Sequence, residues 1–477
     1  MTPVPGPHPA TRRTIFGATV GTLTEYYDFA IYGLMAPTIA SQFFPRADPT
    51  AALLSTFVVF ALGFLFRPLG GFIFGYLGDK FGRTKALTSA ILLMAATTTA
   101  IGLLPTYAGV GLLSPVLLLV CRCLQSVSNG GEFAGATSYL AESAPRDKRA
   151  TFVSTVTVSS AIPAVLGAIV ILTISALLDD GAFTAWGWRI PFLLGAPLGL
   201  IGLYVRLRLA EPEVFTEMKA AGVAPRNPLL TGIRTQWRKM LLVFCAAAVT
   251  ASSYYILNSY MVTYTETELG VSRNASLFMN STAIVIFCVA VLLGGRAADR
   301  FGRRPVIATG LVALVVLGVP AFLLMQTGHL AGVLLGQIVF GLCIAPVSGV
   351  VPALSAELFP TSVRYSCNSM SYNLAYTVFA GTAPFVAAWL VSLTGLLVSP
   401  AIYASSIALV SGVIVFCFLE ETRGTPLEQS VDTGERQGRS EAPGSPDEGR
   451  PAVEGALDGG GGGAESPGRV IEPVDHP

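Results

Sequence analysis

The chain has 477 residues, of which 52% are hydrophobic and only 12% are charged, and its formal net charge is +1. A soluble domain carries about twice that share of charged residues, so the composition excludes a soluble protein and predicts a membrane protein. The seven cysteines lie in or beside apolar stretches, which is typical of small packing residues and implies no disulfide framework.

Apolar stretches of about 20 residues or more recur along the chain, and each is long enough to cross a hydrocarbon core of about 30 Å. Backbone that faces lipid must satisfy its hydrogen bonds within its own segment, so each stretch is expected to be a helix. The sequence predicts an all-α membrane protein with twelve transmembrane helices in two pseudo-symmetric six-helix halves. The expected spans are 15–37, 53–76, 86–106, 112–141, 151–178, 188–208, 240–263, 276–297, 305–326, 332–354, 367–392 and 399–419.

Basic residues gather in alternate loops between these spans. Short cytoplasmic loops are enriched in Lys and Arg, so both termini are expected in the cytoplasm of a multi-pass protein of the plasma (inner) membrane. The tail is rich in Gly, Pro, Ser, Asp and Glu and is expected to be disordered. The predicted organisation is a cytoplasmic N-terminal segment (1–14), a first half (15–208), a cytoplasmic linker (209–239), a second half (240–424) and the tail (425–477).

A short motif occurs twice, at 75–85 and at 295–304, and each copy follows an apolar run. Two similar membrane halves are typical of secondary transporters, whose substrate site lies between the halves. Asp79 and Arg83 of the first copy, like Asp299 and Arg303 of the second, are expected at cytoplasmic helix ends. There they can pair with each other and with helix ends of the other half, which predicts a gating latch. The alternative is that the basic residues only orient the chain in the membrane.

The first span contains two carboxylates, Glu25 and Asp28, on one helix face. Ionisable side chains at membrane depth are expensive and are usually functional. Two carboxylates this close in a low dielectric are not both ionised without a partner, so one is expected to bind a proton, as a proton carrier must. In the alternative they pair with Arg67 or Arg122 and orient the helices, and the two roles are compatible.

The fourth span carries four polar side chains at spacings of three or four residues, which places them on one face of the helix. They are Arg122, Gln125, Asn129 and Glu132. A fixed positive charge, two neutral hydrogen-bonding groups and a carboxylate suit a small charged or zwitterionic solute. We predict that the first three bind the substrate; the alternative is a buried structural network.

Histidine is excluded as a proton relay, because the three histidines lie in the termini or in a predicted external loop. If protons drive transport, Glu25, Asp28 or Glu132 must carry them. These three carboxylates are therefore the predicted proton-coupling residues.

The seventh and eleventh spans each carry aromatic rings and amides. Aromatic faces bind quaternary ammonium groups through the ring quadrupole. We predict that Tyr254 and Asn258 of the seventh span and Tyr372 and Asn373 of the eleventh contact the solute. Tyr is also common at membrane interfaces, so anchoring is the alternative role for the rings.

In several motifs the chain resembles the major facilitator superfamily, and within it the metabolite–proton symporter family, over about residues 12–424. The motifs are Glu25-Tyr26-Tyr27-Asp28-Phe29, Arg67-Pro68-Leu69-Gly70-Gly71, Arg122-Cys123-Leu124-Gln125, Gly130-Gly131-Glu132-Phe133, Trp186-Gly187-Trp188-Arg189-Ile190-Pro191-Phe192 and Glu357-Leu358-Phe359-Pro360-Thr361 with Val363-Arg364-Tyr365. The stretches 101–107 and 198–204 look most like the proline/glycine betaine–proton symporters. The resemblance implies inward transport of a small metabolite together with a proton.

These observations predict a secondary transporter and not an enzyme, and its two halves are expected to rock against each other to alternate access. The predicted reaction is proton-coupled import of proline, glycine betaine or a similar zwitterion. Two alternatives stay open: a dicarboxylate, 2-oxoglutarate or shikimate–proton symporter, and a non-transporting membrane sensor on the same fold. The expected partners are the solute, the proton and the lipid bilayer; no cofactor, metal or nucleic acid is expected.

Overall fold

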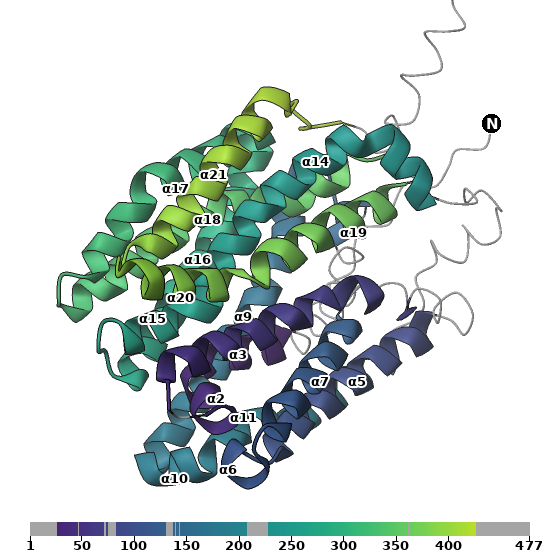
Figure 1. Cartoon of the computed structure of the whole chain (residues 1–477). Coiled ribbons are helices and arrows are strands. Elements are labelled where there is room, and N and C mark those ends of the chain that lie inside the picture. Colours follow the sequence, from purple (N-terminus) through teal and green to yellow (C-terminus); the bar gives the residue numbers. More distant parts are fainter. Residues whose placement is uncertain are drawn as a thin grey trace, which may run out of the picture. The chain divides into compact units, whose positions relative to one another are not determined.

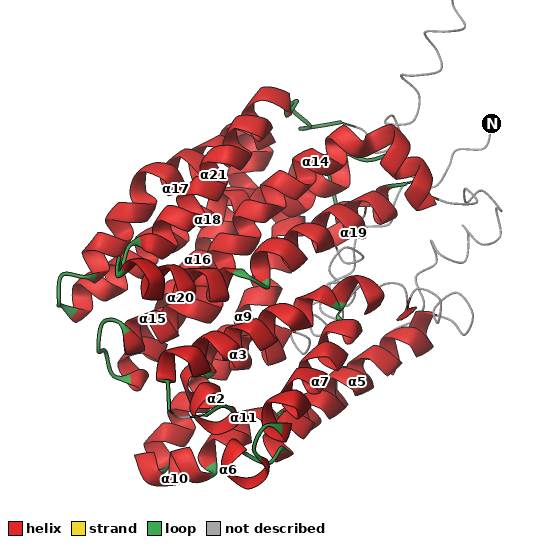
Figure 2. Ribbon diagram, in the orientation of Figure 1, coloured by secondary structure: helices red, strands yellow, loops and turns green. Residues whose placement is uncertain are grey.

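The structure is a computed structural model that describes residues 26–45, 47–70, 73–74, 83–129, 137–138, 140–142, 144–207, 228–360 and 363–425. Every regular element in these residues is a helix (Figure 2), which confirms the predicted all-helical architecture. A helical stretch at 26–34 comes first. The helices of the first half of the sequence that follow are α2 (Ala36–Phe43), α3 (Pro49–Leu65), α5 (Arg83–Leu103), α6 (Tyr107–Val110), α7 (Leu113–Ser128), α9 (Arg149–Leu177), α10 (Asp180–Ala185), α11 (Ile190–Leu193) and α12 (Gly195–Leu207), with short 3-10 turns at η1 (Arg146–Lys148) and η2 (Gly187–Arg189).

The second half of the sequence is also helical throughout its described residues. Its elements are α14 (Pro228–Tyr255), η3 (Ile256–Tyr260), α15 (Met261–Thr267), α16 (Arg273–Phe301), α17 (Arg303–Met325), α18 (Leu330–Glu357), α19 (Arg364–Ala375), η4 (Tyr376–Ala380), α20 (Ala383–Thr394) and α21 (Ser399–Phe418).

Eight helical segments in the described part of the chain are long and apolar enough to cross a membrane. Large apolar side chains also cover the outside of the bundle; on α17, Val312, Val316 and Leu323 are all exposed. Water-soluble proteins rarely expose apolar surface on this scale, whereas the same surface is suited to lipid. The eight segments are Pro49–Gly70, Arg146–Leu177, Gly232–Thr267, Arg273–Phe301, Arg303–Met325, Leu330–Glu357, Ser366–Thr394 and Ser399–Phe418.

Helices that are close in sequence pack together, and α9 connects the early helices with the late ones. In the first half of the sequence, α5 packs against α7 and α12, and α3 packs against α2 and α7. In the second half, α17 packs against α18 and α21, and α14 packs against α19 and α21. The long helix α9 lies against α16 and α18 (Figure 1), so that early and late parts of the sequence meet along it.

Two spans contain a π-helical turn, which the sequence pattern did not predict. In such a turn the backbone hydrogen bonds run from i to i+5, and one inserted residue widens the helix. The turn η3 joins α14 to α15 within one span, and η4 follows α19. Single π-helical turns are frequent at functional sites. Both turns begin at or directly after a buried tyrosine, Tyr255 in one case and Tyr376 in the other.

Two glycines fix the geometry around the second copy of the repeated motif. A Cβ on Gly295 of α16 would lie 2.9 Å from the carbonyl oxygen of Ala150 and 2.7 Å from Oγ of Ser154, both on α9. A larger residue at Gly295 would therefore push α16 and α9 apart. Gly302, between α16 and α17, has φ of +103°, a conformation that side-chain-bearing residues rarely adopt. This glycine permits the tight turn that places Arg303 at the start of α17.

Candidate functional site

A buried polar group joins the first described helical stretch to α5 and α7. Arg122 on α7 is fully buried, and Asp28 is only 3% exposed. Asp28 interacts with the charge of Arg122 and with the hydroxyl of Thr98 on α5. Nη1 of Arg122 donates a hydrogen bond of 2.8 Å to Oε1 of Gln125, and Nε2 of Gln125 donates one of 2.9 Å to Oγ1 of Thr98. The structure therefore brings together one predicted proton carrier and two predicted substrate ligands.

Aromatic rings surround the guanidinium of Arg122. Its Cζ lies 4.7 Å from the ring centre of Phe29, 4.3 Å from that of Tyr32 and 5.1 Å from that of Phe60. Cation–π attraction offsets part of the cost of burying the charge. Among the described residues, however, Nε and Nη2 of Arg122 have no hydrogen-bond acceptor. A buried charged donor without an acceptor is expensive, so these two groups are suited to a carboxylate from a ligand.

Asn129, further along the predicted polar face of α7, contacts a second buried arginine. Nη2 of Arg67, in the span Pro49–Gly70, donates a hydrogen bond of 2.6 Å to Oδ1 of Asn129. Both side chains are at most 2% exposed. Arg122, Gln125 and Asn129 are therefore all buried, and they belong to two adjacent polar groups, one around Arg122 and one around Arg67.

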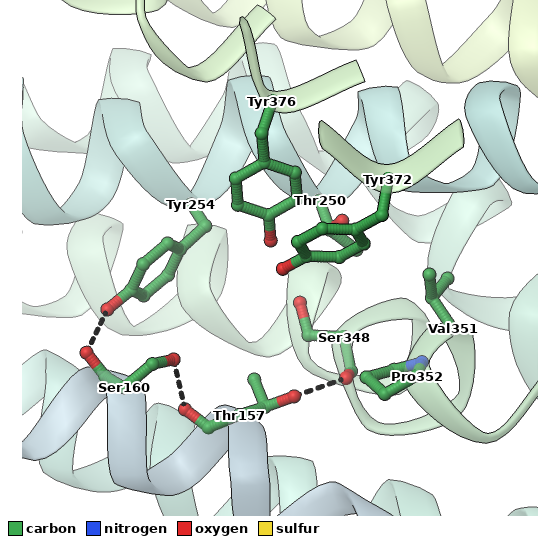
Figure 3. Close-up of a pocket in the computed structure, with 9 residues that line it drawn as sticks. All are labelled: Thr157, Ser160, Thr250, Tyr254, Ser348, Val351, Pro352, Tyr372 and Tyr376. Carbon is green, nitrogen blue, oxygen red and sulfur yellow. Dashed lines mark hydrogen bonds between the residues drawn. The ribbon is translucent and has the colours of Figure 1, made fainter. Parts of the chain in front are cut away.

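A small cavity lies between α9, α14, α18 and the junction of α19 with η4 (Figure 3). The hydroxyl of Tyr254 donates to the carbonyl of Ser160 (3.4 Å), and Oγ1 of Thr157 donates to the carbonyl of Ser348 (3.2 Å). These bonds connect α9 to α14 and α18 across the cavity. Hydroxyl groups and tyrosine rings make up most of its wall, which consists of Thr157, Ser160, Thr250, Tyr254, Ser348, Val351, Pro352, Tyr372 and Tyr376.

Ring contacts connect this cavity with the surroundings of Arg122. The rings of Tyr372 and Tyr376 are stacked, with centres 4.1 Å apart, and they lie face to face in Figure 3. The centre of Tyr376 is 6.1 Å from that of Tyr255, which in turn is 6.1 Å from that of Phe60. Phe60 is one of the rings around Arg122. The buried guanidinium and the cavity are therefore two ends of one aromatic cluster.

The volume of the cavity is about 20 Å³, which is room for about one water molecule. A solute the size of an amino acid does not fit in this space. The helices around the cavity must separate before such a solute can enter, so the cavity is closed to it in this conformation.

Besides Arg122, Gln125 and Asn129, two more predicted substrate ligands do not line this cavity. Asn258, in η3, is buried and donates a hydrogen bond of 3.4 Å to Oγ of Ser259. Asn373, on α19, is half-buried and donates one of 3.2 Å to Oγ of Ser369. Neither contributes to the cavity wall in this conformation. Their predicted contact with a solute remains a prediction.

Several residues that line the cavity were missed by the sequence prediction. Thr157 and Ser160 on α9 and Ser348 on α18 supply hydroxyl groups to the wall. Thr157 and Ser160 are three residues apart in an apolar span, so they share a helix face. This spacing was the signal that could have identified them. Hydroxyl residues within membrane helices are common, which is why the signal is weak.

The second copy of the repeated motif bonds to the beginning of α9. Oδ1 of Asp299 accepts a hydrogen bond from the backbone N–H of Ala150 (3.0 Å). Oδ2 of Asp299 accepts bonds from the N–H (2.8 Å) and the hydroxyl (2.7 Å) of Thr151. The first N–H groups of a helix have no partner within the helix, and the helix dipole favours an anion there. The structure thus places Asp299 at the N-terminal end of α9, and its part in a gating latch remains a prediction.

Arg303 extends this contact into a buried ionic network. Its Nη1 donates a hydrogen bond of 3.1 Å to Oδ1 of Asp299, and its Nη2 donates one of 2.8 Å to Oε1 of Glu357 on α18. Nη1 of Arg149 donates 3.2 Å to the same oxygen of Glu357, and the hydroxyl of Thr422 donates 2.7 Å to its Oε2. Glu357 and Arg149 were not predicted as gating residues, although Glu357 belongs to one of the motifs that carry the resemblance.

Other predicted site residues lie outside the described residues. They are Glu25, Glu132 and Asp79, and of Arg83 only the backbone, at the start of α5, is described. The proton-carrying roles of Glu25 and Glu132 and the first copy of the latch therefore stay predictions.

An all-helical membrane bundle with a closed polar cavity between early and late helices has the architecture of a secondary transporter. A sequence model of the Major Facilitator Superfamily matches residues 18–294 and 243–454. The glycine betaine/proline/ectoine/pipecolic acid transporter OusA of Dickeya dadantii is 37% identical over 434 residues, which cover 87% of this chain and 85% of OusA. The proline/betaine transporter of Escherichia coli (strain K12) is 36% identical over the same shares.

Solved structures have the same fold. The proton:xylose symporter XylE bound to 6-bromo-6-deoxy-D-glucose has a TM-score of 0.65 at 18% identity and covers 87% of this chain and 97% of its own. A partially occluded inward-open XylE from E. coli has a TM-score of 0.67 at 17% identity and covers 87% and 99%. This chain belongs to the major facilitator superfamily, and it is a multi-pass membrane protein.

Proposed function

We propose that the protein is a proton-coupled symporter that imports a small zwitterion, with proline or glycine betaine as the first candidates. The observation that carries this proposal is the environment of Arg122. Its guanidinium is fully buried, two of its nitrogen atoms lack acceptors among the described residues, and a cluster of aromatic rings connects it with a hydroxyl-lined cavity. Such a site offers a carboxylate its ion pair and a quaternary ammonium group its ring faces. The names of the related transporters support the same pair of solutes.

The charges inside the predicted spans favour a zwitterion over a dicarboxylate. In the sequence the interior of the first-half spans holds two guanidinium groups, on Arg67 and Arg122, and three carboxylates, on Glu25, Asp28 and Glu132. One carboxylate is in excess, and a single proton neutralises it. A zwitterion adds no net charge, so a centre loaded with one proton and one zwitterion is neutral. A dicarboxylate would add uncompensated negative charge at membrane depth, which is expensive.

Three carboxylates are proposed as proton carriers, and of these Asp28 belongs to the described residues. It is buried and interacts with both Thr98 and Arg122. When the solute carboxylate binds Arg122, it weakens the pairing between Arg122 and Asp28. Asp28 then holds a proton more readily, because a carboxylate without its cationic partner favours the neutral form in a low dielectric. Solute and proton binding are thereby coupled through one guanidinium.

The wider architecture in this proposal has twelve transmembrane helices in two six-helix halves, 15–208 and 240–424. A cytoplasmic linker (209–239) joins the halves, and both termini are cytoplasmic. Asp299, Arg303 and their partners hold the cytoplasmic side closed in the described conformation, and the first motif copy with Asp79 and Arg83 acts in the corresponding place. Transport then alternates between closure at the two ends of the bundle.

Uptake by purified protein in proteoliposomes tests the function. The vesicles have an alkaline interior, so that the proton gradient is directed inward. Labelled proline, glycine betaine, 2-oxoglutarate and shikimate are each added to the outside. The proposal expects uphill accumulation of proline or betaine that a protonophore collapses. Accumulation of 2-oxoglutarate or shikimate alone would make the protein a carboxylate symporter, and a lack of any uptake would favour the sensor.

A further inference from the structure

Arg67 is a buried cation at the boundary between early and late helices. It is 1% exposed, and its Cζ lies 5.2 Å from the ring centre of Phe64 and 5.9 Å from that of Tyr376. Phe64 is on α3, whereas Tyr376 begins η4 of the second half of the sequence. Arg67 also interacts with Tyr255 on α14. Together with its bond to Asn129, these contacts connect the end of the second predicted span with η4 and with the last residue of α14.

The two sets of helices pack tightly beside this arginine. Oγ1 of Thr377 donates a hydrogen bond of 3.3 Å to the carbonyl of Phe64, and a Cβ on Gly381 would lie 2.7 Å from Cβ of Phe64. The guanidinium of Arg67 is therefore part of the contact that keeps α3 against η4 in the closed conformation. A movement of Arg67 away from Tyr376 would loosen that contact.

Tyr376 has two neighbours that a cationic solute would have to replace. Tyr372 is stacked on it at 4.1 Å, and the Arg67 guanidinium lies over its ring. Tyr376 and Tyr372 both line the cavity. A quaternary ammonium group that entered the cavity and met the Tyr376 ring would compete with the guanidinium, since both cations are attracted by the same quadrupole and repel each other.

We infer that Arg67 is a specificity-determining residue: in the closed conformation its guanidinium lies over the ring of Tyr376 that receives the cationic end of the solute, and solute binding displaces it. This inference rests on the proposed transport of a zwitterion. It adds a mechanism by which the solute opens the contact between early and late helices. Only a solute with a cationic group displaces Arg67, so a carboxylate without a cation binds without loosening α3 from η4.

The test compares glycine betaine with its isostere 3,3-dimethylbutanoate, which keeps the carboxylate but has a neutral carbon in place of the cationic nitrogen. Labelled betaine uptake gives the KM, and inhibition of that uptake gives the inhibition constant of 3,3-dimethylbutanoate. The readout is the ratio of the inhibition constant to the KM, because effects on folding, membrane level or carboxylate binding change both constants alike. Arg67→Gln removes the competing cation and keeps a hydrogen-bonding side chain for Asn129.

We expect the ratio to rise about fivefold in Arg67→Gln, because betaine gains a free ring while the isostere gains nothing; this corresponds to about 1 kcal/mol. Arg67→Lys should leave the ratio near that of the wild type, since it keeps a cation. Arg238→Gln is the matched control: Arg238 is exposed and lies over Trp237 at 5.5 Å, away from the cavity, so its loss should leave the ratio unchanged.

The outcomes separate this inference from the proposed function. If the wild type takes up betaine but Arg67→Gln leaves the ratio unchanged or lowers it, Arg67 only stabilises the fold and the inference is wrong. If Arg67→Gln does not reach the membrane, the same ratio is measured in Arg67→Met, and an unchanged or lower ratio again shows that the inference is wrong. If the wild type takes up neither betaine nor proline, the proposed function is wrong and the inference is lost with it.

Discussion

The substitution Asp299→Asn should destabilise the closed conformation at the end of the bundle where the second motif copy contacts α9. Asp299 accepts three hydrogen bonds from the first residues of α9 and one from Arg303. Asparagine keeps one acceptor oxygen and presents an amide N–H to the remaining donors. At least two of the four bonds are therefore lost, and so are the ion pair and the favourable charge at the end of α9.

The magnitude follows from these contacts. A hydrogen bond that involves a charged group contributes about 1.5–3 kcal/mol. The loss of two such bonds at a site that is 9% exposed should cost about 3 kcal/mol. If the open conformation lacks these contacts altogether, the whole amount appears in the balance between closed and open states. The open state should then become about 100-fold more populated relative to the closed state.

Alkylation of a cysteine in the cavity measures this shift. Ser348→Cys, introduced into a protein without its native cysteines, places a thiol in the cavity wall. A membrane-impermeant maleimide reacts with it only when the cavity opens, and inside-out vesicles present the side that we place in the cytoplasm. Asp299→Asn should raise the alkylation rate at least tenfold from that side.

Asp147→Asn is the matched control for this experiment. Asp147 is an exposed acid directly before α9, and within the described residues it forms no ion pair. Its substitution removes the same charge from the same region and should leave the alkylation rate within a factor of two. Equal rates in Asp299→Asn and the wild type would refute the latch and leave the motif with a topogenic role.

Three further substitutions test other parts of the site. Asp28→Asn should abolish accumulation under a pH gradient, because an amide keeps its hydrogen bonds in the site but does not take up and release a proton. Exchange of labelled for unlabelled solute should persist. Loss of both activities, or of neither, argues against this role. Arg122→Lys should raise the KM about tenfold at an unchanged membrane level, since the charge remains but the bidentate fork is lost; recovery of uptake in Arg122→Gln with Glu132→Gln would show that Arg122 only neutralises that carboxylate. Gly295→Leu should expose the cavity to alkylation as Asp299→Asn does, because its side chain has no room against Ala150; an unchanged alkylation rate would contradict the close approach.

Local sequence patterns indicated which polar side chains share one helix face. The spacing of Arg122, Gln125 and Asn129 indicated a shared face, and all three side chains are buried. The duplicated motif indicated that Asp299 would reach a helix end in the first half, and it bonds to the start of α9. In both cases one helical period or one repeat carries the information.

Features that depend on packing between distant segments were not accessible from the sequence. Arg149 and Glu357 are 208 residues apart, and no local pattern indicates that they share an ionic network. The π-helical turns η3 and η4 interrupt two spans whose residues have ordinary helical composition. The membership of Tyr376 and Ser348 in one cavity wall likewise follows from the approach of α18 to η4, which only a three-dimensional structure specifies.

Solute-induced proton entry is the most direct test of the central claim that one buried centre couples a zwitterion to a proton. Proteoliposomes that contain a pH-sensitive dye receive glycine betaine on the outside, without an imposed gradient. The account predicts acidification of the lumen with wild-type protein and none with Asp28→Asn, although the variant still exchanges betaine. Betaine uptake without any acidification in the wild type would contradict proton coupling, and acidification that persists in Asp28→Asn would contradict the assignment of Asp28 as the carrier.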